Sequence, residues 1–393
     1  MKIYFIGQKG LPALYGGIEK HVEELSTRLV KAGHEVFVYT RSNYTDKNLK
    51  KYQGVNLISL PTIATKHFDA ISHTFYCCLN LMKRDVDIIH FHSIGPSSLI
   101  WLVKLLKPGT PVVFTFHTKC YEHKKWGALA KLCLRIGERV ACRLADKVIT
   151  ISPSLAEYIF VKYKIDAAYI PNGVSLSKIV KADRIKKWGL KKDNYILTVT
   201  RLVGHKGVRY LIEAYKNLKT NKKLVIAGGG AYTNNYVKEL KAAASGNKNI
   251  IFTGNQAGYE LVELFSNAYL FVQPSESEGL SIALLEAMAY KNCVIVSDII
   301  ENKYVVGEAG FIFKNKNIKN LRIKLIYLLK QPQLVKKYGL LAKARVSQNY
   351  NWSKIVLATL KIYCQTLTNT NKPANNLFFR LKLVRRIVTM FML

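Results

Sequence analysis

Short runs of apolar and β-branched residues alternate with segments of helical periodicity, and this rhythm runs through most of the chain. In the first half the expected strands cover residues 2–6, 35–40, 55–60, 87–93, 111–117 and 146–152. Continuous apolar runs of this kind are typical of strands buried on both faces, as in a parallel sheet covered by helices. The first half is therefore predicted to be a doubly wound α/β domain.

The pattern restarts after an interruption at residues 170–174, where IPNGV combines a proline with an Asn-Gly turn signal. The expected strands of the second half cover residues 195–202, 223–230, 249–255, 268–275 and 293–298. A length of 393 residues suits two or three domains of roughly 150 residues each. The sequence thus predicts two similar α/β domains, 1–170 and 175–348.

The chain ends in helices and a basic, apolar tail. Helices are expected near 317–330 and 333–350, and NYNWSKIVLATLKIYCQTL predicts a further one over 349–366. In the tail, 367–393, a polar segment precedes residues 377–393, which alternate large apolar side chains with four basic ones. This composition is typical of an interfacial membrane anchor, and the alternative is a frayed basic terminus that contacts nothing.

Basic residues outnumber acidic residues by 60 to 25, which gives a formal charge of +35. A field of this sign attracts nucleic acids, phosphorylated small molecules or an anionic lipid surface. The alternative is a lysine-rich background that is solvated on helix faces. No RRM-like or zinc-finger pattern accompanies the charge, so nucleic acid is not expected as a partner.

The cysteines and the N-terminus indicate the compartment. Seven cysteines without a CxxC pair or a zinc spacing read as thiols in a reducing environment. The start MKIYFIG lacks the apolar core of a secretory signal, and no window reaches the ~18 uninterrupted apolar residues of a membrane span. We expect a cytoplasmic protein that can associate peripherally with the inner face of the cell membrane.

Ligands bind at the carboxyl ends of the strands in sheets of this type, so glycines and polar residues at these positions are candidates. Gly16 and Gly17 precede the first helix, where bare backbone N–H groups can bind a phosphate; a plain flexible loop is the alternative. The spacing matches neither a dinucleotide fingerprint nor a Walker loop. His92 and His117 each end a strand and can donate to a hydroxyl or phosphate, or merely cap the strand.

In the second half, Arg201 and Lys206 follow the strand YILTVT. Two cations at one turn can hold the charges of a diphosphate, although a chance basic pair is common in a lysine-rich chain. Glu278 lies in the loop before a helix expected to start near residue 281, and Glu286 is placed about two turns inside that helix.

Carboxylates accept hydrogen bonds from the vicinal hydroxyls of a sugar or ribose, and backbone N–H groups at the start of this helix suit a phosphate. Two alternatives remain for these glutamates. One glutamate can interact favourably with the positive end of the helix dipole while the other is an ordinary surface residue, or the two can form a glycosidase-like carboxylate pair. The nearby cations favour a phosphorylated ligand.

Three motifs together resemble a known family. They are GLPALYGGIEKHVEELSTRLVKAGHEV, RLVGHKG and ESEGLSIALLEAMAYKNCVIVSD, and over residues 1–366 the chain resembles the family 4 retaining glycosyltransferases of the GT-B fold. The resemblance implies two Rossmann-like parallel-sheet domains that face each other across a cleft. It also implies that the helix over 349–366 crosses back to the N-terminal domain.

The resemblance also implies roles for the matching residues. Those that would bind the donor are Gly16, Gly17, Arg201, Lys206, Glu278, Gly279, Leu280, Ser281 and Glu286. Those that would take part in catalysis are His117, Arg201, Lys206 and Glu278. Glu19 and His21 would lie on the acceptor side. No metal and no other cofactor is expected, because the cations neutralise the diphosphate.

The function implied is retaining transfer of a sugar from a nucleotide-diphosphate sugar to an acceptor hydroxyl, on a glycan or a lipid-linked precursor of the cell surface. Two alternatives stay open: a nucleotide-sugar epimerase of the same fold, which needs no acceptor, and a basic membrane- or nucleic-acid-binding protein. The sequence does not identify the sugar, the base or the acceptor.

Overall fold

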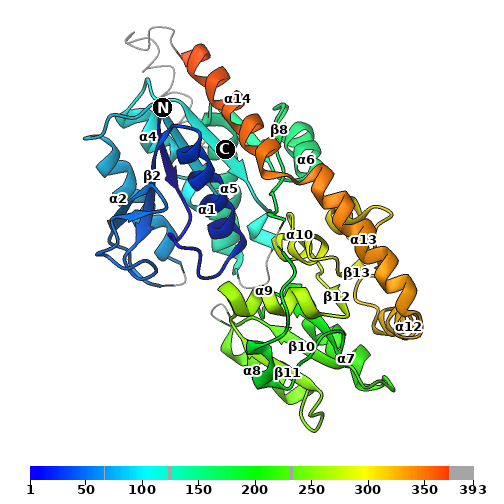
Figure 1. Ribbon diagram of the computed structural model, residues 1–393. Helices are drawn as coiled ribbons and strands as arrows, with labels where there is room; N and C mark the ends of the chain where they lie inside the picture. The colour runs from blue at the N-terminus through cyan, green and yellow to red at the C-terminus, as the bar shows by residue number, and fades with distance from the viewer. Residues whose placement is uncertain (66, 123–125, 177, 231–232, 371–393) are drawn as a thin grey trace. The chain divides into compact units, whose positions relative to one another are not determined.

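The computed structural model describes residues 1–65, 67–122, 126–176, 178–230 and 233–370, and the chain divides into two compact units (Figure 1). Unit 1 contains Met1–Pro171 together with the segment that begins at Trp352, and unit 2 contains Asn172–Asn351. The anchor predicted at 377–393 lies outside the described residues. Among the described helices, none combines the length and the hydropathy that crossing a membrane would need.

Unit 1 is built on an eight-stranded sheet. In spatial order its strands are β3 (Lys51–Tyr52), β4 (Val55–Leu60), β2 (Glu35–Arg41), β1 (Lys2–Ile6), β5 (Ile88–His92), β6 (Val112–Phe116), β7 (Lys147–Thr150) and β8 (Ala168–Tyr169). All neighbouring pairs are parallel except β3 with β4. Strands β5 and β6 are buried along their whole length, as the continuous apolar runs predict.

The helices of unit 1 are α1 (Gly17–Lys31), α2 (Asp69–Leu81), α3 (Ile94–Ser97), α4 (Ile100–Leu106), α5 (Ala128–Leu144), α6 (Pro153–Tyr163) and α14 (Trp352–Thr370). Helix α1 buries Val22, Leu25 and Leu29, which recur at the helical period and face the sheet. A 3-10 turn at Cys120–Glu122 follows β6. The predicted doubly wound domain is therefore confirmed for this unit.

Helix α14 belongs to unit 1 although it ends the described chain. Its residues Trp352, Ile355, Val356 and Tyr363 are buried in the same core cluster as the first strands of the protein. The helix packs against α1 and β6 (Figure 1). The crossing back of the last helix is thus present, and it begins at Trp352 rather than at 349, because Asn351 still pairs with Val174 in unit 2.

Unit 2 has a six-stranded sheet in which every neighbouring pair is parallel. In spatial order its strands are β11 (Ile250–Gly254), β10 (Lys223–Ala227), β9 (Tyr195–Val199), β12 (Leu270–Gln273), β13 (Cys293–Ser297) and β14 (Phe311–Phe313). Its helices are α7 (Val208–Lys216), α8 (Asn234–Ala243), α9 (Gly258–Asn267), α10 (Ile282–Ala289), α11 (Ile300–Val306), α12 (Ile318–Leu329) and α13 (Pro332–Asn349). Two 3-10 turns lie at Arg184–Trp188 and Gly204–Lys206.

Candidate active site

The strand order of unit 2 reverses between β9 and β12. These two strands are neighbours, while β10 and β11 lie on one side of them and β13 and β14 on the other. The chain therefore continues from β9 and from β12 toward opposite edges of the sheet, and ligands of open parallel sheets bind at such a reversal. The loop after β9 carries Arg201 and Lys206, and the loop after β12 carries Glu278.

Lys206 and Glu278 meet at this point as an ion pair. The Lys206 Nζ lies 2.6 Å from both carboxylate oxygens of Glu278. The Glu278 Oε1 also accepts hydrogen bonds from Gln273 Nε2 at 2.6 Å and from Ser275 Oγ at 2.7 Å. The exposed fractions of the Lys206 and Glu278 side chains are only 13% and 6%. Both charged groups are thus held in fixed positions in a largely dehydrated environment.

Backbone contacts lock the two loops together. The Glu276 N–H donates to the carbonyl oxygen of His205 at 2.7 Å. Gly207, at the end of the first loop, has a φ of 67°, and a Cβ there would lie 1.9 Å from the carbonyl oxygen of Pro274. Only glycine combines this left-handed conformation with so close an approach. The Lys206–Glu278 pair is therefore built by the backbone as well as by its charges.

The electrostatics of the pair favour an anionic ligand. The pKa of Lys206 is lowered because burial removes water from the ammonium group, and the nearby Arg201 guanidinium lowers it further, while Glu278 opposes both effects. Arg201 itself is exposed. A multiply charged anion at this position would restore a favourable partner to both cations.

Helix α10 begins beside this pair. Ser281 is its N-cap residue and accepts a hydrogen bond from the Leu284 N–H at 3.3 Å. The Ser281 Oγ also donates weakly to Gln273 Oε1 at 3.4 Å, which ties the helix start to the end of β12. The prediction of two turns between the helix start and Glu286 was wrong: α10 begins at Ile282, so Glu286 lies little more than one turn inside it.

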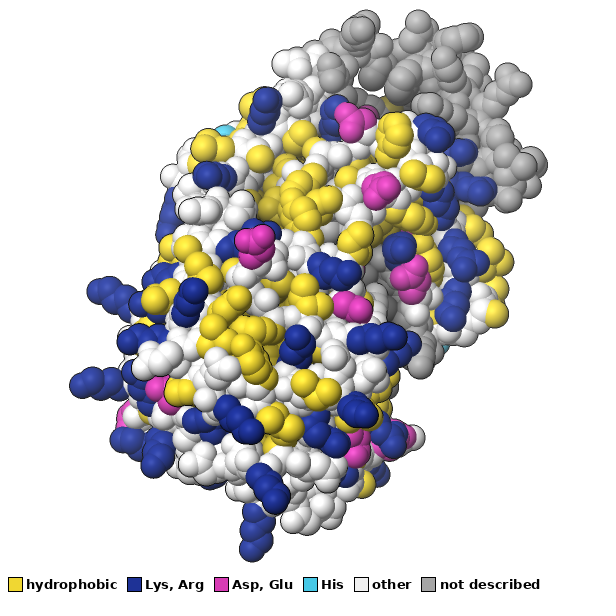
Figure 2. Space-filling model, turned by 90° about the vertical axis from the view of Figure 1, so that its right-hand side faces the viewer, with side chains coloured by type: hydrophobic (Ala, Val, Ile, Leu, Met, Phe, Trp, Pro, Cys, Tyr) yellow, Lys and Arg dark blue, Asp and Glu magenta, His cyan; other side chains and the backbone are white. Residues whose placement is uncertain are grey.

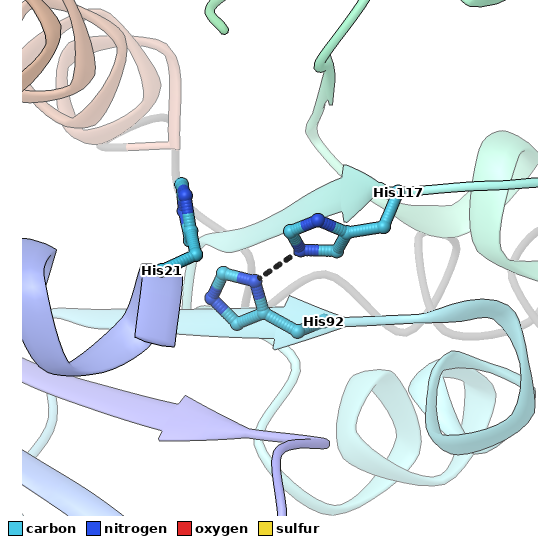
Figure 3. A group of neighbouring side chains, drawn as sticks. All are labelled: His21, His92 and His117. Atoms are coloured by element: carbon cyan, nitrogen blue, oxygen red, sulfur yellow. Dashed lines mark hydrogen bonds between the residues drawn. The ribbon is translucent and has the colours of Figure 1, made fainter. Parts of the chain in front are cut away.

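In unit 1 the strand order reverses between β1 and β5. His92 is the last residue of β5, and its neighbour Ser93 has a φ of 72°, a strained conformation for a residue other than glycine. His117 directly follows β6, and His21 lies little more than one turn inside α1 (Figure 3). All three imidazoles are buried, and their ring centroids lie 5.2–5.5 Å apart.

A hydrogen bond joins His92 Nδ1 to His117 Nε2 at 2.9 Å (Figure 3). Among the described residues, nothing forms a hydrogen bond with the other ring nitrogen of His92, Nε2, which is buried. A buried N–H group without an acceptor is rarer than a buried acceptor without a donor, so we assign the proton of His92 to Nδ1. His92 then donates to His117, and the proton of His117 lies on Nδ1.

The pKa values of His92 and His117 are both lowered well below the usual 6.5, chiefly because burial disfavours the charged imidazolium. Neighbouring imidazoles lower them further. Both rings are therefore neutral near pH 7. His117 can donate one hydrogen bond from Nδ1 to a ligand oxygen, but it is not an imidazolium.

The glycine loop after β1 lies at the same reversal. Gly16 is the N-cap of α1 with a φ of 105° and a ψ of 137°, and a Cβ there would lie 2.0 Å from the Glu19 Oε2. Gly17 is the first helical residue, and its N–H points out of the helix start. Glu19 is buried and accepts a hydrogen bond from the Lys9 N–H at 3.1 Å, so it fixes the loop.

The three imidazoles also have the geometry of a possible metal ligand set. One nitrogen from each of His21, His92 and His117 lies within 4.8 Å of the others. Neutral imidazoles are good ligands for divalent transition metals. The hydrogen bond between His92 and His117 already uses one of these lone pairs, however, and the expectation of no metal stays a prediction.

The structure thus groups the proposed site residues at two strand reversals. Lys206, Glu278 and Ser281 lie together in unit 2 with Arg201 nearby, and Glu286 and the backbone of Gly279 and Leu280 belong to the same loop and helix start. Gly16, Gly17, Glu19, His21 and His117 lie together in unit 1. Sequence reasoning missed Gln273 and Ser275, whose signal was their position at the end of the strand AYLFVQPS.

Comparisons with known proteins agree with this architecture. The family profile described as "Glycosyltransferase Family 4" matches residues 15–178, and the profile described as "Glycosyl transferases group 1" matches residues 180–345. An alpha-monoglucosyldiacylglycerol synthase of Streptococcus pneumoniae is 28% identical over 305 residues, which cover 71% of this chain and 67% of that protein.

An uncharacterized glycosyltransferase of Methanocaldococcus jannaschii is 27% identical, with 92% of this chain and 98% of that protein covered. Among solved structures, sucrose-phosphate synthase of Thermosynechococcus elongatus has a TM-score of 0.80 at 22% identity, with 94% of this chain and 100% of that chain covered. That structural likeness shows the fold. The chain therefore belongs to glycosyltransferase family 4 and is a glycosyltransferase of the GT-B fold.

Proposed function

We propose that the protein transfers a hexosyl group from a nucleotide-diphosphate sugar to an acceptor hydroxyl, with retention of the anomeric configuration. The single observation that supports this best is the Lys206–Glu278 pair at the reversal of the unit 2 sheet. A buried cation and a buried carboxylate, side by side, suit a ligand that has both phosphates and hydroxyls. A nucleotide sugar is such a ligand.

Different residues bind different parts of the donor. Lys206 directs two of its three N–H bonds at Glu278, which leaves one for a phosphate oxygen, and the exposed Arg201 supplies a planar fork for the same diphosphate. The N–H groups at the start of α10 add the positive end of a helix dipole. Glu278 accepts from the hydroxyls of the sugar, and Glu286 from those of the ribose.

The same groups serve the reaction. Departure of the diphosphate places negative charge on the leaving oxygen, and cations that are already fixed stabilise it without reorganisation. The acceptor attacks from the face that the diphosphate leaves, and the leaving phosphate takes the proton of the acceptor. The neutral His117 donates from Nδ1 to an oxygen of the donor sugar, which orients the reacting carbon.

The acceptor is proposed from the relatives. Two of them, from Streptococcus pneumoniae and Acholeplasma laidlawii, are named alpha-monoglucosyldiacylglycerol synthases, and one from Bacillus subtilis is named a putative teichuronic acid biosynthesis glycosyltransferase. By analogy, this protein acts on a lipid-linked or cell-surface glycan precursor. It works on the cytoplasmic side and contacts the anionic inner face of the membrane, as its charge of +35 favours.

A donor screen tests the proposal. UDP-, GDP- and dTDP-sugars are added in turn, and protection against thermal unfolding is recorded; a ligand at 100 times its Kd stabilises by about 2.7 kcal/mol. One class of donor should protect the wild-type protein and the control Lys238→Ala, which changes an exposed lysine of α8. Lys206→Ala should abolish the protection.

Protection by none of the donors, or equal protection of Lys206→Ala, would contradict the assignment. Product analysis with the donor alone separates the epimerase alternative, because an epimerase changes the sugar without an acceptor. A transferase leaves the sugar attached or releases it slowly to water.

A further inference from the structure

The outward face of α2 carries no charged side chain. The only charged residue of this 13-residue helix is Asp69, which pairs with the buried Arg41 at 2.7 Å. Phe75, Tyr76 and Leu79 are 45%, 40% and 40% exposed. They lie at a spacing that places them on one side of the helix, in line with the exposed Phe68 before it and Met82 after it.

The opposite side of α2 is firmly packed. His73, Cys77, Cys78 and Leu81 are buried against the rest of unit 1. The helix is therefore anchored through one face and exposes apolar side chains on the other. Five large apolar groups in a row are more than the scattered exposed residues of an ordinary surface, and such patches mark interaction sites.

The apolar surface continues beyond the helix. Ile63 is exposed, and together with Leu99 and residues of α2 it lines a shallow groove of about 300 Å³. The ring of His67, which precedes Phe68 in the sequence, lies 5.6 Å from that of Trp126, which precedes α5. Leu129 and Leu132, in the first turns of α5, are also exposed. We call Ile63, Phe68, Phe75, Tyr76, Leu79 and Met82 the α2 surface.

Basic residues border this surface at the C-terminal end of α2. Lys83 and Arg84 follow Met82 and are exposed. Lys107 lies beside them, because its Nζ donates to the carbonyl oxygen of Arg84 at 2.6 Å. The neighbouring acid Asp85 is paired with Lys2 at 2.7 Å. Positively charged side chains thus lie next to the apolar α2 surface.

The exposed leucines of α13 are arranged differently. On α13, Leu340 and Leu341 share a shallow depression with Lys336 and Lys337. The face drawn in Figure 2 likewise has Lys and Arg side chains spread among the hydrophobic ones. Lysines between apolar groups keep a surface in water, whereas the α2 surface separates the two kinds of side chain.

We propose that the α2 surface inserts into the headgroup region of an anionic lipid bilayer. A helix with an uncharged apolar face and cations at its border is suited to lie in the plane of a membrane, with the apolar side chains in the acyl boundary and the cations at lipid phosphates. This proposal deepens the function proposed above, since it would bring the protein to a lipid-linked acceptor. It depends on residues that are far in sequence from the donor-binding Lys206 and Glu278.

The test measures binding of the full-length protein to vesicles of phosphatidylcholine, with and without phosphatidylglycerol. Cosedimentation should detect binding to the anionic vesicles and much weaker binding to the neutral ones. Amide hydrogen exchange with and without anionic vesicles then locates the contact. Peptides that cover residues 68–82 should exchange more slowly in the presence of the vesicles.

The variant Phe75→Ser/Leu79→Ser should lower the partition coefficient by about tenfold or more, because two inserted side chains are lost. The matched control Leu340→Ser/Leu341→Ser removes two exposed leucines from α13 and should bind as the wild type does. Both variants should retain thermal protection by the nucleotide sugar. Failure of the donor screen would thus be distinguishable from failure of the membrane contact.

Three results would overturn the proposal. The first is no binding to anionic vesicles. The second is binding that leaves the exchange of α2 unchanged, which would assign the contact to another segment such as residues 377–393. The third is a concentration-dependent dimer in sedimentation velocity that the Phe75→Ser/Leu79→Ser variant abolishes, which would show that a second copy of the chain covers this surface.

Discussion

At the scale of single residues, the Lys206–Glu278 pair, proposed above to bind the donor, also contributes to stability. Because both side chains are largely buried, neither can lose its partner without leaving a charge in a poorly solvated position. The sequence pattern predicts the roles of the two residues but not this direct contact, since the loops that carry them are 72 residues apart. A substitution at either residue therefore changes two properties.

Lys206→Ala should lower kcat/KM by about 10²–10³-fold, because a fixed cation at the leaving group is lost. It should also lower the free energy of unfolding by about 3 kcal/mol, because Glu278 is left as an unpaired buried carboxylate. The double variant Lys206→Ala/Glu278→Gln should regain most of that stability in denaturant melts and none of the activity. Recovery of activity in the double variant would show that Lys206 acts only through the fold.

The histidine pair gives a second prediction at this scale. His92→Leu removes the hydrogen bond to His117 Nε2, so the proton of His117 is no longer held on Nδ1. We expect kcat to fall by on the order of 10- to 100-fold with little change in KM. Nitrogen-15 NMR of the histidines should show His117 protonated on Nδ1 in the wild type and a mixture of tautomers in His92→Leu.

His92→Asn is the matched variant, because its side-chain amide keeps a donor near the position of Nδ1 and should restore part of kcat. A wild-type spectrum with His117 protonated on Nε2 would refute the assignment. The sequence indicates both histidines as strand-end residues, but their contact depends on the pairing of β5 with β6, which no local pattern reports.

At the scale of elements, the contact of α14 with the unit 1 sheet is the clearest case of a long-range tie. The Tyr363 hydroxyl and His90 Nδ1 are joined by a buried hydrogen bond of 2.7 Å across 273 residues of sequence. The His90 Nε2 is joined to Thr115 Oγ1 at 2.7 Å. The last helix is therefore connected to two central strands through one imidazole.

Tyr363→Phe should lower the free energy of unfolding by about 1–3 kcal/mol, because it leaves a buried nitrogen of His90 without its partner. The isosteric ring keeps the packing, so the m-value in urea should not change. The exposed Tyr327→Phe, on α12, is the control and should have no measurable effect. An equal loss in the two variants would mean that the hydroxyl of Tyr363 contributes nothing specific.

Elements with strong periodicity were predicted correctly, and short or atypical ones were not. The strands with continuous apolar runs and helix α1 follow directly from the sequence. Strand β14 has only three residues, too few for a pattern to be recognised. Helix α2 has apolar residues on both its buried and its exposed sides, so it lacks the alternation of apolar and polar faces that identifies a surface helix.

At the scale of the whole molecule, the parallel strands of the two sheets agree with the prediction of two doubly wound halves. Which residues from distant parts of the sequence contact each other could be learned only from the structure. The order reversals between β1 and β5 and between β9 and β12 give each unit one place for a ligand. The two places differ in chemistry. Unit 1 has neutral imidazoles there, and unit 2 has fixed charges.

This difference predicts how pH affects stability. The pKa values of His90, His92 and His117 are all lowered well below 6.5 in the folded protein, chiefly by burial. Below pH 6.5 the unfolded chain therefore binds more protons than the folded one, and the free energy of unfolding falls as the pH falls. Below about pH 6.5, each of the three histidines contributes about 1.4 kcal/mol per pH unit to the slope of the free energy of unfolding against pH. Above about pH 6.5, none of them contributes to this slope.

Urea melts between pH 7.5 and pH 5 measure this slope. His92→Leu should reduce the slope by about 1.4 kcal/mol per pH unit. In the function proposed above the diphosphate contacts Arg201 and Lys206 and His117 stays neutral, so the nucleotide sugar should raise stability by a similar amount at each pH in this range. A slope that His92→Leu does not alter would mean that His92 takes up a proton in the folded protein as readily as in the unfolded one, and the description of the His92–His117 pair as neutral would be refuted.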